Sequence, residues 1–340
     1  MKIIITGGAG YIGSHTAVEA IRAGHEVIII DNLSNSRIDS IDNIGRAAGK
    51  RPLFINAEVT SDFCCFNKEL KDYLIGAKAL IHFAAFKSSP DSVDDPLGYY
   101  QNNIGSLVGA LKLCETFGVE NFIFSSSATV YGDPQFVPIT EDHPILKGGT
   151  PYGSSKIVGE WILRDFTKAK RIKSVSLRYF NPAGADHTLM IGEFPLGKPA
   201  NLVPIITQAA AKIIPALTIT GIDFPTPDGS AIRDYIHVSD LALSHISALS
   251  WINNEGFNTF ECFNIGTGTG TSVIEMVKSF IQINKDSLLE YNTGPRRLGD
   301  PPEVWCDPQK AKKILGWEAK LDVSDILESA WKWEKKIRNI

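Results

Sequence analysis

Short apolar runs alternate with longer amphipathic stretches along the first half of the chain. Glycine or polar residues bound each apolar run, which is typical of buried strands, and the stretches between the runs have a helical period. The predicted strands are residues 2–6, 26–31, 52–56, 79–83, 121–125 and 174–179. The predicted helices include residues 11–23, 96–117 and 152–168. Because strands that alternate with crossover helices pair in parallel, this order predicts an α/β fold with a doubly wound parallel sheet.

The pattern changes after about Pro182, where prolines and glycines interrupt it. Such a stretch predicts loops and short helices over a site. The prolines are Pro195, Pro199, Pro204, Pro215, Pro225 and Pro227. Regular patterns return at 234–249 and 260–265, and residues 323–337 predict a helix with Ile326, Leu327, Ala330 and Trp331 on one face. We therefore expect a first domain over residues 1–181, with returning segments near 234–265, and a smaller C-terminal α/β lobe over residues 182–340.

Composition narrows the possible partners. The chain has 340 residues and a net charge of −4, which argues against a nucleic-acid or membrane partner held by charge alone. No apolar run reaches the roughly 18 residues that a membrane span needs. The cysteine count is low and odd, without a Cys-x-x-Cys pair, so we expect reduced thiols, a cytoplasmic protein and no metal site. The cysteines are Cys64, Cys65, Cys114, Cys262 and Cys306.

A glycine-rich loop follows the first predicted strand and opens the first predicted helix. Its spacing is Gly7-x-x-Gly10-x-x-Gly13. Glycines permit the tight turn and let the backbone approach a pyrophosphate, to which the helix N-terminus offers free amides. In this strand–loop–helix context the motif predicts a Rossmann-like dinucleotide site, although a glycine-rich turn without a ligand stays open as an alternative.

Asp31 ends the second predicted strand, 18 residues after Gly13. A carboxylate at this place can accept hydrogen bonds from both ribose hydroxyls of NAD and would repel a 2′-phosphate. Arg37 lies near in sequence, so NADP is not excluded. The structural alternative is that Asp31 caps the turn before Asn32.

Tyr152 and Lys156 are four residues apart and share one face of a predicted helix. A tyrosine with a pKa near 10 needs about 4 kcal/mol of preferential phenolate stabilisation to act as a base at neutral pH. The Lys156 ammonium and an oxidised nicotinamide ring could each supply part of it. Ser127, at the end of the predicted strand that precedes them, could hydrogen-bond the reacting hydroxyl. Together these residues predict acid–base chemistry coupled to hydride transfer.

These residues resemble the extended short-chain dehydrogenase/reductase family and, more narrowly, its epimerases that act at C4 of UDP-hexoses. The similar stretches span nearly the whole chain: 6–15, 31–36, 82–87, 121–133, 150–156, 177–184, 233–240 and 295–300. The resemblance implies that Tyr152 takes the proton of the sugar 4-hydroxyl. It implies that a tightly held NAD accepts the C4 hydride and returns it to the other face of a transient 4-keto sugar. It also implies a homodimer built on the helices 96–117 and 152–168, with an NAD-binding first domain and a UDP-sugar-binding second lobe.

The resemblance also implies contacts residue by residue. The cofactor contacts would be Gly7, Gly10, Tyr11, Ile12, Gly13, Asp31, Asn32, Leu33, Ser34, Asn35, Ser36, Glu58, Val59, Phe83, Ala84, Ala85, Phe86, Lys87, Asn102, Ser127, Tyr152, Lys156 and Phe180. The substrate contacts would be Lys87, Ser127, Tyr152, Asn181, Asn201, Leu202, Thr220, Arg233, Arg297, Asp300 and Val304. Arg233 and Arg297 match diphosphate contacts and Asp300 matches a ribose contact. For Arg233 a structural pair with Asp234 or another acid stays open, and His82 is interpreted as a packed strand-end histidine.

Three positions depart from the family pattern. Glu58-Val59 stands where Asp-Ile is usual beside the adenine. Thr220 stands where some epimerases have an aromatic residue that stacks on uracil, unless Phe224 takes that role. Val304 is intermediate between the large aromatic residues associated with plain hexoses and the small residues associated with 2-acetamido sugars. We therefore expect some activity on UDP-GlcNAc or UDP-GalNAc.

Three other functions compete with epimerisation. A 4,6-dehydratase needs an acid and a base beside the serine strand, where this chain has Ala128 and Thr129. A dehydrogenase or reductase would exchange its cofactor at each turnover. A cofactor-sensing binding protein would not need the pair formed by Tyr152 and Lys156.

Overall fold

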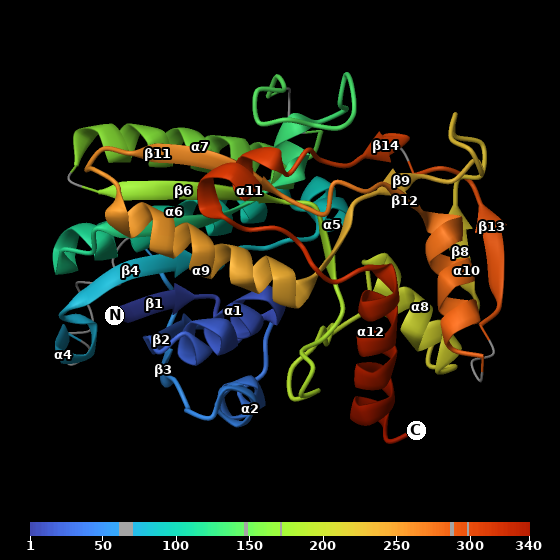
Figure 1. Ribbon diagram of the computed structural model, residues 1–340, viewed down its shortest axis with the longest axis horizontal. Coiled ribbons are helices and arrows are strands. Elements are labelled where there is room, and N and C mark those ends of the chain that lie inside the picture. Colours follow the sequence, from blue (N-terminus) through green and yellow to red (C-terminus); the bar gives the residue numbers. More distant parts are fainter. Residues whose placement is uncertain (61–70, 146–148, 171, 286–288, 298) are drawn as a thin grey trace.

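Seven parallel strands form the main sheet, in the order β11-β6-β5-β4-β1-β2-β3 (Figure 1). This computed structural model describes residues 1–60, 71–145, 149–170, 172–285, 289–297 and 299–340. The strands are β1 (Lys2–Thr6), β2 (Glu26–Asp31), β3 (Leu53–Asn56), β4 (Ala77–His82), β5 (Asn121–Ser127), β6 (Lys173–Tyr179) and β11 (Phe260–Ile265). The predicted strands are confirmed with boundaries shifted by at most two residues, and the order is that of a Rossmann-like doubly wound sheet with β11 added at one edge.

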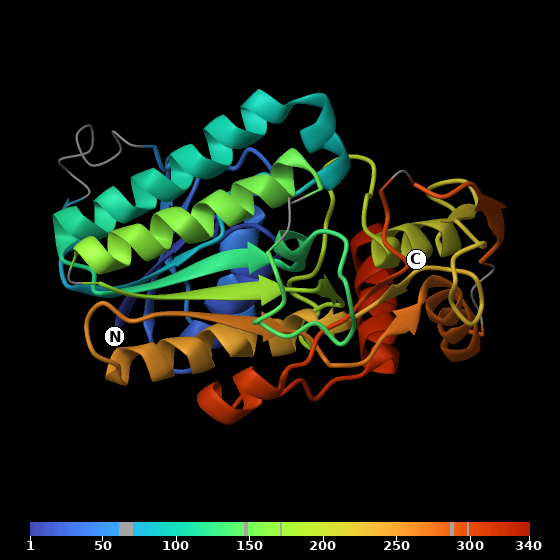
Figure 2. The same ribbon diagram turned by 90° about the horizontal axis from the view of Figure 1, so that it is seen from above.

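Helices cover both faces of this sheet (Figure 2). One face carries α1 (Tyr11–Arg22), α2 (Asp39–Ala48) and α9 (Val238–Asn254), and the other carries α6 (Pro96–Phe117) and α7 (Pro151–Ala169). Within β1, Ile3 and Ile5 face the first layer of helices, whereas Ile4 faces the second. The continuous apolar run of β1 follows from this burial on both sides. Two short helices, α4 (Lys71–Leu74) and α5 (Ser89–Asp94), complete this half.

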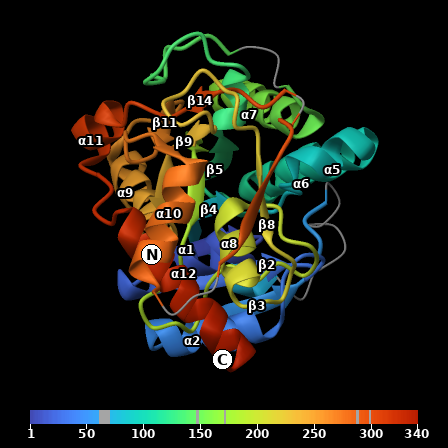
Figure 3. The ribbon, with the colours of Figure 1, turned by 90° about the vertical axis from the view of Figure 1, so that its right-hand side faces the viewer.

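A smaller lobe lies beyond the carboxyl ends of the strands (Figures 1 and 3). Its core is formed by α8 (Leu202–Ala210), α10 (Val273–Ile283), α12 (Val323–Arg338) and β8 (Leu217–Thr220), and β8 pairs with the more exposed β13 (Tyr291–Gly294). The predicted C-terminal helix is confirmed, with Ile326, Leu327 and Ala330 buried in that core. In the described residues, no helix is both long and apolar enough to cross a membrane.

Short strands connect the lobe to the main sheet. These are β7 (Asn181–Ala183) with β10 (Tyr235–His237), and β9 (Ile232–Arg233) with β12 (Thr271–Ser272) and β14 (Glu303–Val304). The chain then returns to the main sheet through α11 (Gln309–Leu315), and Ala311 and Trp317 pack into the core of that sheet. The connecting strands thus bring residues of the lobe beside the ends of the main strands.

Candidate active site

The loop between β1 and α1 requires glycine at two positions. Gly7 has a left-handed backbone with φ of 70°, and a Cβ atom added there would lie 2.6 Å from the backbone nitrogen of Ala84. A Cβ atom on Gly13 would collide with the carbonyl oxygen of Gly7. Gly10 caps α1 without a side chain. The first amides of the helix therefore point to the edge of the sheet and suit an anionic group.

Asp31 connects two loops of this edge. Its Oδ2 atom accepts a 3.0 Å hydrogen bond from the backbone of Ala9 in the glycine loop. Its Oδ1 atom accepts hydrogen bonds of 2.9 Å from the backbone of Leu33 and from the Ser36 hydroxyl. Asp31 does cap the following turn, as the structural alternative requires, but it does so beside the glycine loop. The two roles are compatible, because a carboxylate has about four acceptor sites.

The segment after Asp31 favours NAD over NADP. Leu33 adopts a left-handed φ of 59°, a backbone strain that clusters at functional sites. The guanidinium of Arg37 is held by Asp39 at 2.8 Å and lies 4.9 Å from the centre of the Phe194 ring. A 2′-phosphate would have to displace Asp39 to bind Arg37.

Tyr152 and Ser127 are brought together by a helix start and a strand end. Tyr152 lies in the first turn of α7, and its hydroxyl is hydrogen-bonded with Ser127, the last residue of β5. The helix begins here because the Thr150 hydroxyl accepts a 3.3 Å bond from the Gly153 backbone, and because Pro151 suits the first helical position. The local sequence thus places the tyrosine at the carboxyl edge of the sheet.

Lys156 lies beside this pair and is only 4% exposed. Its ammonium donates a 2.7 Å hydrogen bond to the carbonyl oxygen of Ser125 and lies 5.7 Å from the centre of the Tyr152 ring. Burial lowers the pKa of Lys156 to about 8, and the negative charge of Glu160 opposes that shift.

The pKa of Tyr152 is raised, whereas a base that acts at neutral pH needs a lowered pKa. Burial raises it to about 12, and the hydrogen bond with Ser127 opposes the increase. The Lys156 ammonium keeps its charge while it donates to the Ser125 carbonyl, so it can still supply part of the phenolate stabilisation. A positive charge bound beside the tyrosine would supply more.

The loop after β4 is anchored by Asn103, which is not among the predicted site residues. Asn103 is buried, and its side chain accepts a 2.8 Å bond from the Phe86 backbone and donates to the Phe86 carbonyl and the Ser155 hydroxyl, both at 3.1 Å. Asn102, a predicted cofactor contact, donates to the Asn103 side chain at 3.0 Å. Two adjacent asparagines in an apolar helix were the available signal. Their network fixes the loop that carries Lys87.

His82 is confirmed as a packed strand-end histidine. Its Nδ1 atom is hydrogen-bonded with the Thr6 hydroxyl at 2.8 Å, its ring stacks on Phe124, and burial lowers its pKa to about 3. Phe83, the next residue, packs against the ring of His245 at 5.0 Å.

Arg233 and Asp300 form an ion pair on the lobe side, and Arg233 also donates to the Pro301 carbonyl at 2.9 Å. The alternative of a structural pair with an acid is therefore correct for Arg233. The acid is Asp300, which is itself a predicted substrate contact. Asp234 is not the partner: it is buried and accepts bonds from the Thr267 backbone and hydroxyl at 2.8 and 2.7 Å. Arg233 also donates to the Ile232 carbonyl at 2.7 Å and to the Pro302 carbonyl at 3.5 Å. Both terminal nitrogens of the guanidinium therefore have protein partners, with which a diphosphate would have to compete.

Phe224 does not replace the aromatic residue that is missing at Thr220. Its side chain is 5% exposed, and the guanidinium of Arg296 lies 4.2 Å from the centre of its ring. Arg296 is in turn held by Asp223 at 2.6 Å. Thr220 is partly exposed at the end of β8, and Arg297 is exposed.

Val304 connects the chemical and the lobe side of the site. In β14 it is in register with Arg233 of β9, and its side chain packs partly against a cluster that includes Phe180, Val130 and Tyr131. The last two belong to the 3-10 turn Ala128–Tyr131 that follows Ser127 directly. A larger residue at 304 would therefore change the space between these two regions.

The other predicted contacts lie in loops after the strands, at the first turns of α1 and α8 or, for Asn181, at the start of β7. Tyr11 donates a 2.7 Å bond to the Gly184 carbonyl. Glu58 is exposed, whereas Val59 is buried. Ile12 packs against the core of the main sheet and Leu202 against the core of the lobe, and the Asn32 side chain accepts a 3.1 Å bond from the Ser34 backbone. Ser34 and Asn35 are exposed, and Ala85 and Asn181 are half-buried.

A buried ion pair near Tyr152 and Lys156 is also absent from the predicted site. Arg178 and Glu160 are 2% and 1% exposed and contact each other at 2.7 Å. Glu160 also accepts a 2.6 Å bond from the Ser126 hydroxyl. The signal in the sequence was Arg178 itself, a charge inside a buried strand pattern.

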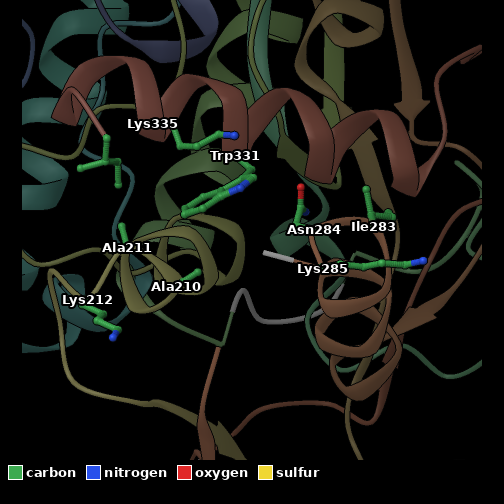
Figure 4. Close-up of a pocket in the computed structure, with 9 residues that line it drawn as sticks. Ala210, Ala211, Lys212, Ile283, Asn284, Lys285, Trp331 and Lys335 are labelled. Carbon is green, nitrogen blue, oxygen red and sulfur yellow. The ribbon is translucent and has the colours of Figure 1, made fainter. Parts of the chain in front are cut away.

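A cavity of about 590 Å³ lies elsewhere, among the ends of α8, α10 and α12 (Figure 4). Trp331 projects toward it from α12, and the lining contains none of the predicted site residues. It is therefore separate from the site at the carboxyl edge of the sheet.

Comparisons with known proteins agree with this geometry. The family model described as GDP-mannose 4,6 dehydratase matches residues 4–330. The UDP-glucose 4-epimerase of Yersinia enterocolitica is 45% identical over 98% of each chain. This chain belongs to the UDP-glucose 4-epimerase family.

Two solved structures of epimerases from that family are each 38% identical to this chain, and each alignment covers 100% of this chain and 99% of the other chain. The structure from Stenotrophomonas maltophila, with bound NAD and formylated UDP-arabinopyranose, has a TM-score of 0.94. The structure from Bifidobacterium longum, in complex with NAD+ and UDP, has a TM-score of 0.93.

The family model is named for a dehydratase, whereas these relatives of the UDP-glucose 4-epimerase family are epimerases. Residues 128 and 129 bear on the difference. Ala128 is buried and has no ionisable group, and Thr129 offers only a hydroxyl. Neither can serve as the acid or base that water elimination needs.

Proposed function

We propose that this chain catalyses the reversible C4 epimerisation of a UDP-hexose through a transient 4-keto sugar. The hydrogen-bonded Tyr152 and Ser127, with Lys156 beside them and no acid at Ala128, carry this proposal. Tyr152 takes the proton of the 4-hydroxyl and Ser127 orients that hydroxyl. Bound NAD supplies reversible hydride acceptance.

The remaining residues hold the two ligands. The glycine loop and Asp31 suit the pyrophosphate and ribose of NAD in the first domain. Arg233, Arg297 and Asp300 suit the UDP moiety in the smaller lobe. Firm binding of UDP beside a loosely held hexose lets the keto sugar turn and present its other face. Val304 supports acceptance of UDP-GlcNAc and UDP-GalNAc as well as UDP-glucose and UDP-galactose.

The test is a direct assay. The purified protein should interconvert UDP-glucose and UDP-galactose without added cofactor, and denaturation should release NAD. Stoichiometric reduction of added NAD by a UDP-sugar would instead indicate a dehydrogenase. Loss of water from the substrate would indicate a dehydratase.

We also propose a cytoplasmic homodimer. The low, odd number of cysteines supports the location. The outer faces of α5, α6 and α7 support the dimer, because they expose Val93, Leu97 and Trp161 at 60%, 79% and 56%. Light scattering after size exclusion should give a dimer mass, and Leu97→Glu with Trp161→Glu should shift it to a monomer. A monomeric wild type would contradict the proposal.

A further inference from the structure

Glu193 lies in the proline-interrupted segment between β7 and α8, where the sequence pattern predicts only loops and short helices. Its side chain is 10% exposed although it is a carboxylate. A carboxylate that is mostly buried needs partners. Both of its side-chain partners in the described structure are predicted site residues.

The first partner is Lys87 and the second is Asn201. The Oε1 atom of Glu193 accepts a 3.2 Å bond from the Lys87 ammonium and a 2.8 Å bond from the Asn201 amide. Lys87 follows β4 on the cofactor side, whereas Asn201 precedes α8 on the lobe side. Burial raises the pKa of Tyr11, the first residue of α1, and the negative charge of Glu193 adds to that rise. The charge of Glu193 thus acts on Tyr11 and Lys87 on the cofactor side and on Asn201 on the lobe side.

The backbone of Glu193 is fixed to the C-terminal helix. The indole nitrogen of Trp333 donates a 2.8 Å bond to the Glu193 carbonyl. The neighbouring Gly192 packs against the ring of Trp333 so closely that an added Cβ atom would lie 2.6 Å from it. These contacts with α12 are typical of a fixed support and not of a mobile lid.

The Asn201 side chain contacts Glu193 and does not cap the helix that follows it. It occupies the N-cap of α8, where asparagine side chains usually accept a hydrogen bond from the helix, but it forms no side-chain cap. A lysine ammonium has three donors and a carboxamide nitrogen has two. Glu193 engages one donor of each, so both groups keep donors for a ligand while their orientation is fixed.

We propose that Glu193 is a positioning residue that orients Lys87 toward the cofactor and sugar and Asn201 toward the UDP diphosphate. This rests on the proposed function. Glu193 touches neither ligand, and it aligns the cofactor half with the substrate half. The competing role is that of an internal anion that occupies Lys87 and Asn201 until a phosphate displaces it. The two roles predict opposite changes in UDP affinity.

The experiment compares Glu193→Ala and Glu193→Gln with the wild-type holoenzyme, by calorimetric titration with UDP, steady-state kinetics with UDP-galactose and thermal unfolding. Glu193→Ala removes the acceptor of both partners, so UDP should bind about tenfold more weakly, which corresponds to about 1.4 kcal/mol. Glu193→Gln keeps an oxygen for Asn201 but loses the charge opposite Lys87. It should restore UDP affinity to within about twofold while kcat stays about tenfold low. Glu328→Gln is the matched control, because Glu328 pairs with Lys332 at 3.1 Å on the exposed side of α12.

Tighter UDP binding by Glu193→Ala would overturn the proposal in favour of an internal anion. If both variants lose UDP affinity and kcat equally, and the losses parallel a fall in Tm, Glu193 has only a structural role. If the wild type binds UDP but converts no UDP-galactose, the proposed function fails while the UDP titrations still test the contact with Asn201. If the wild type converts the sugar and both variants match it, only the positioning role fails.

Discussion

The Lys156 ammonium donates a 2.7 Å hydrogen bond to the carbonyl oxygen of Ser125, two residues before Ser127. This bond joins α7 to the end of β5, and so holds Tyr152 and Ser127 in register. It also keeps a lysine in a place where burial disfavours its charge and lowers its pKa to about 8. Stability and catalysis therefore conflict at Lys156.

Lys156→Met should stabilise the protein near neutral pH and abolish activity. Below pH 8 Lys156 is charged in both states, but the folded protein buries that charge whereas the unfolded chain keeps it in water. Folding therefore has to desolvate the ammonium. Between pH 8 and 10.5 the unfolded chain binds a proton that the folded protein does not bind, so wild-type stability rises with pH. A shift of this size corresponds to about 3 kcal/mol, reduced by the lost bond to Ser125. Urea unfolding should show the variant more stable by about 1–2 kcal/mol at pH 7.

That advantage should disappear as pH rises from 8 to 10.5. Lys168→Met, an exposed position on the same helix, is the control and should change stability little. An advantage of Lys156→Met that does not depend on pH would show that packing, and not charge, is responsible.

Tyr152→Phe should abolish epimerisation and leave the fold and cofactor content intact. The substitution removes only the hydroxyl that is bonded with Ser127. Loss of a positioned acid–base group typically lowers the rate by about 10²–10⁴-fold. Activity should be measured together with the NAD released on denaturation. Activity within tenfold of wild type would exclude Tyr152 as the base.

Local patterns predicted the elements of the main sheet well. The strand that ends at Asp31 and the helix that begins near Tyr152 were predictable because burial on two faces and an N-cap act over a few residues. Glu193 and Asn103 were not, because their roles arise from contacts with Lys87 and Phe86 that no local period encodes.

The lobe shows the same limit. Its prolines predicted irregular structure. The ion pair of Arg233 with Asp300 joins residues far apart in sequence, so no local pattern could identify the acidic partner of Arg233. The missing aromatic at Thr220 was visible, whereas the burial of Phe224 under Arg296 was not.

Thr220→Phe should tighten UDP binding. Phe224 is covered by Arg296, so a new ring at 220 would add a stacking surface for uracil. Aromatic stacking contributes about 0.5–1.5 kcal/mol, which corresponds to about two- to tenfold in Kd. Thr218→Phe is the matched control, because Thr218 shares a face of β8 with Thr220 but is exposed two residues earlier. Equal effects of both variants in UDP titrations would exclude a specific stack.

Glu160→Gln should destabilise the protein by about 3–5 kcal/mol, because it leaves the buried Arg178 without its counter-charge. Replacing both residues, with Glu160→Leu and Arg178→Met, should be less harmful than the single change. Urea unfolding of both variants measures this. A loss below 1 kcal/mol in Glu160→Gln would show that water or a neighbouring group compensates Arg178.

Val304→Tyr should narrow the substrate range. Val304 packs beside Phe180 and Tyr131 and is in register with Arg233, so a tyrosine there would extend between the 3-10 turn after Ser127 and the diphosphate side. A plain hexose should still fit, whereas a 2-acetamido group should meet the added ring. Activity on UDP-GlcNAc should fall at least about tenfold, equivalent to about 1.4 kcal/mol, while activity on UDP-glucose changes less than about threefold. Competition kinetics with both sugars measure the ratio of the two activities directly.

Val304→Ile, which adds one methylene without a ring, controls for packing and should keep the wild-type ratio. An equal loss on both sugars in Val304→Tyr would mean that residue 304 supports the site without selecting the sugar, and a wild type inactive on the acetamido pair would refute the expected dual activity.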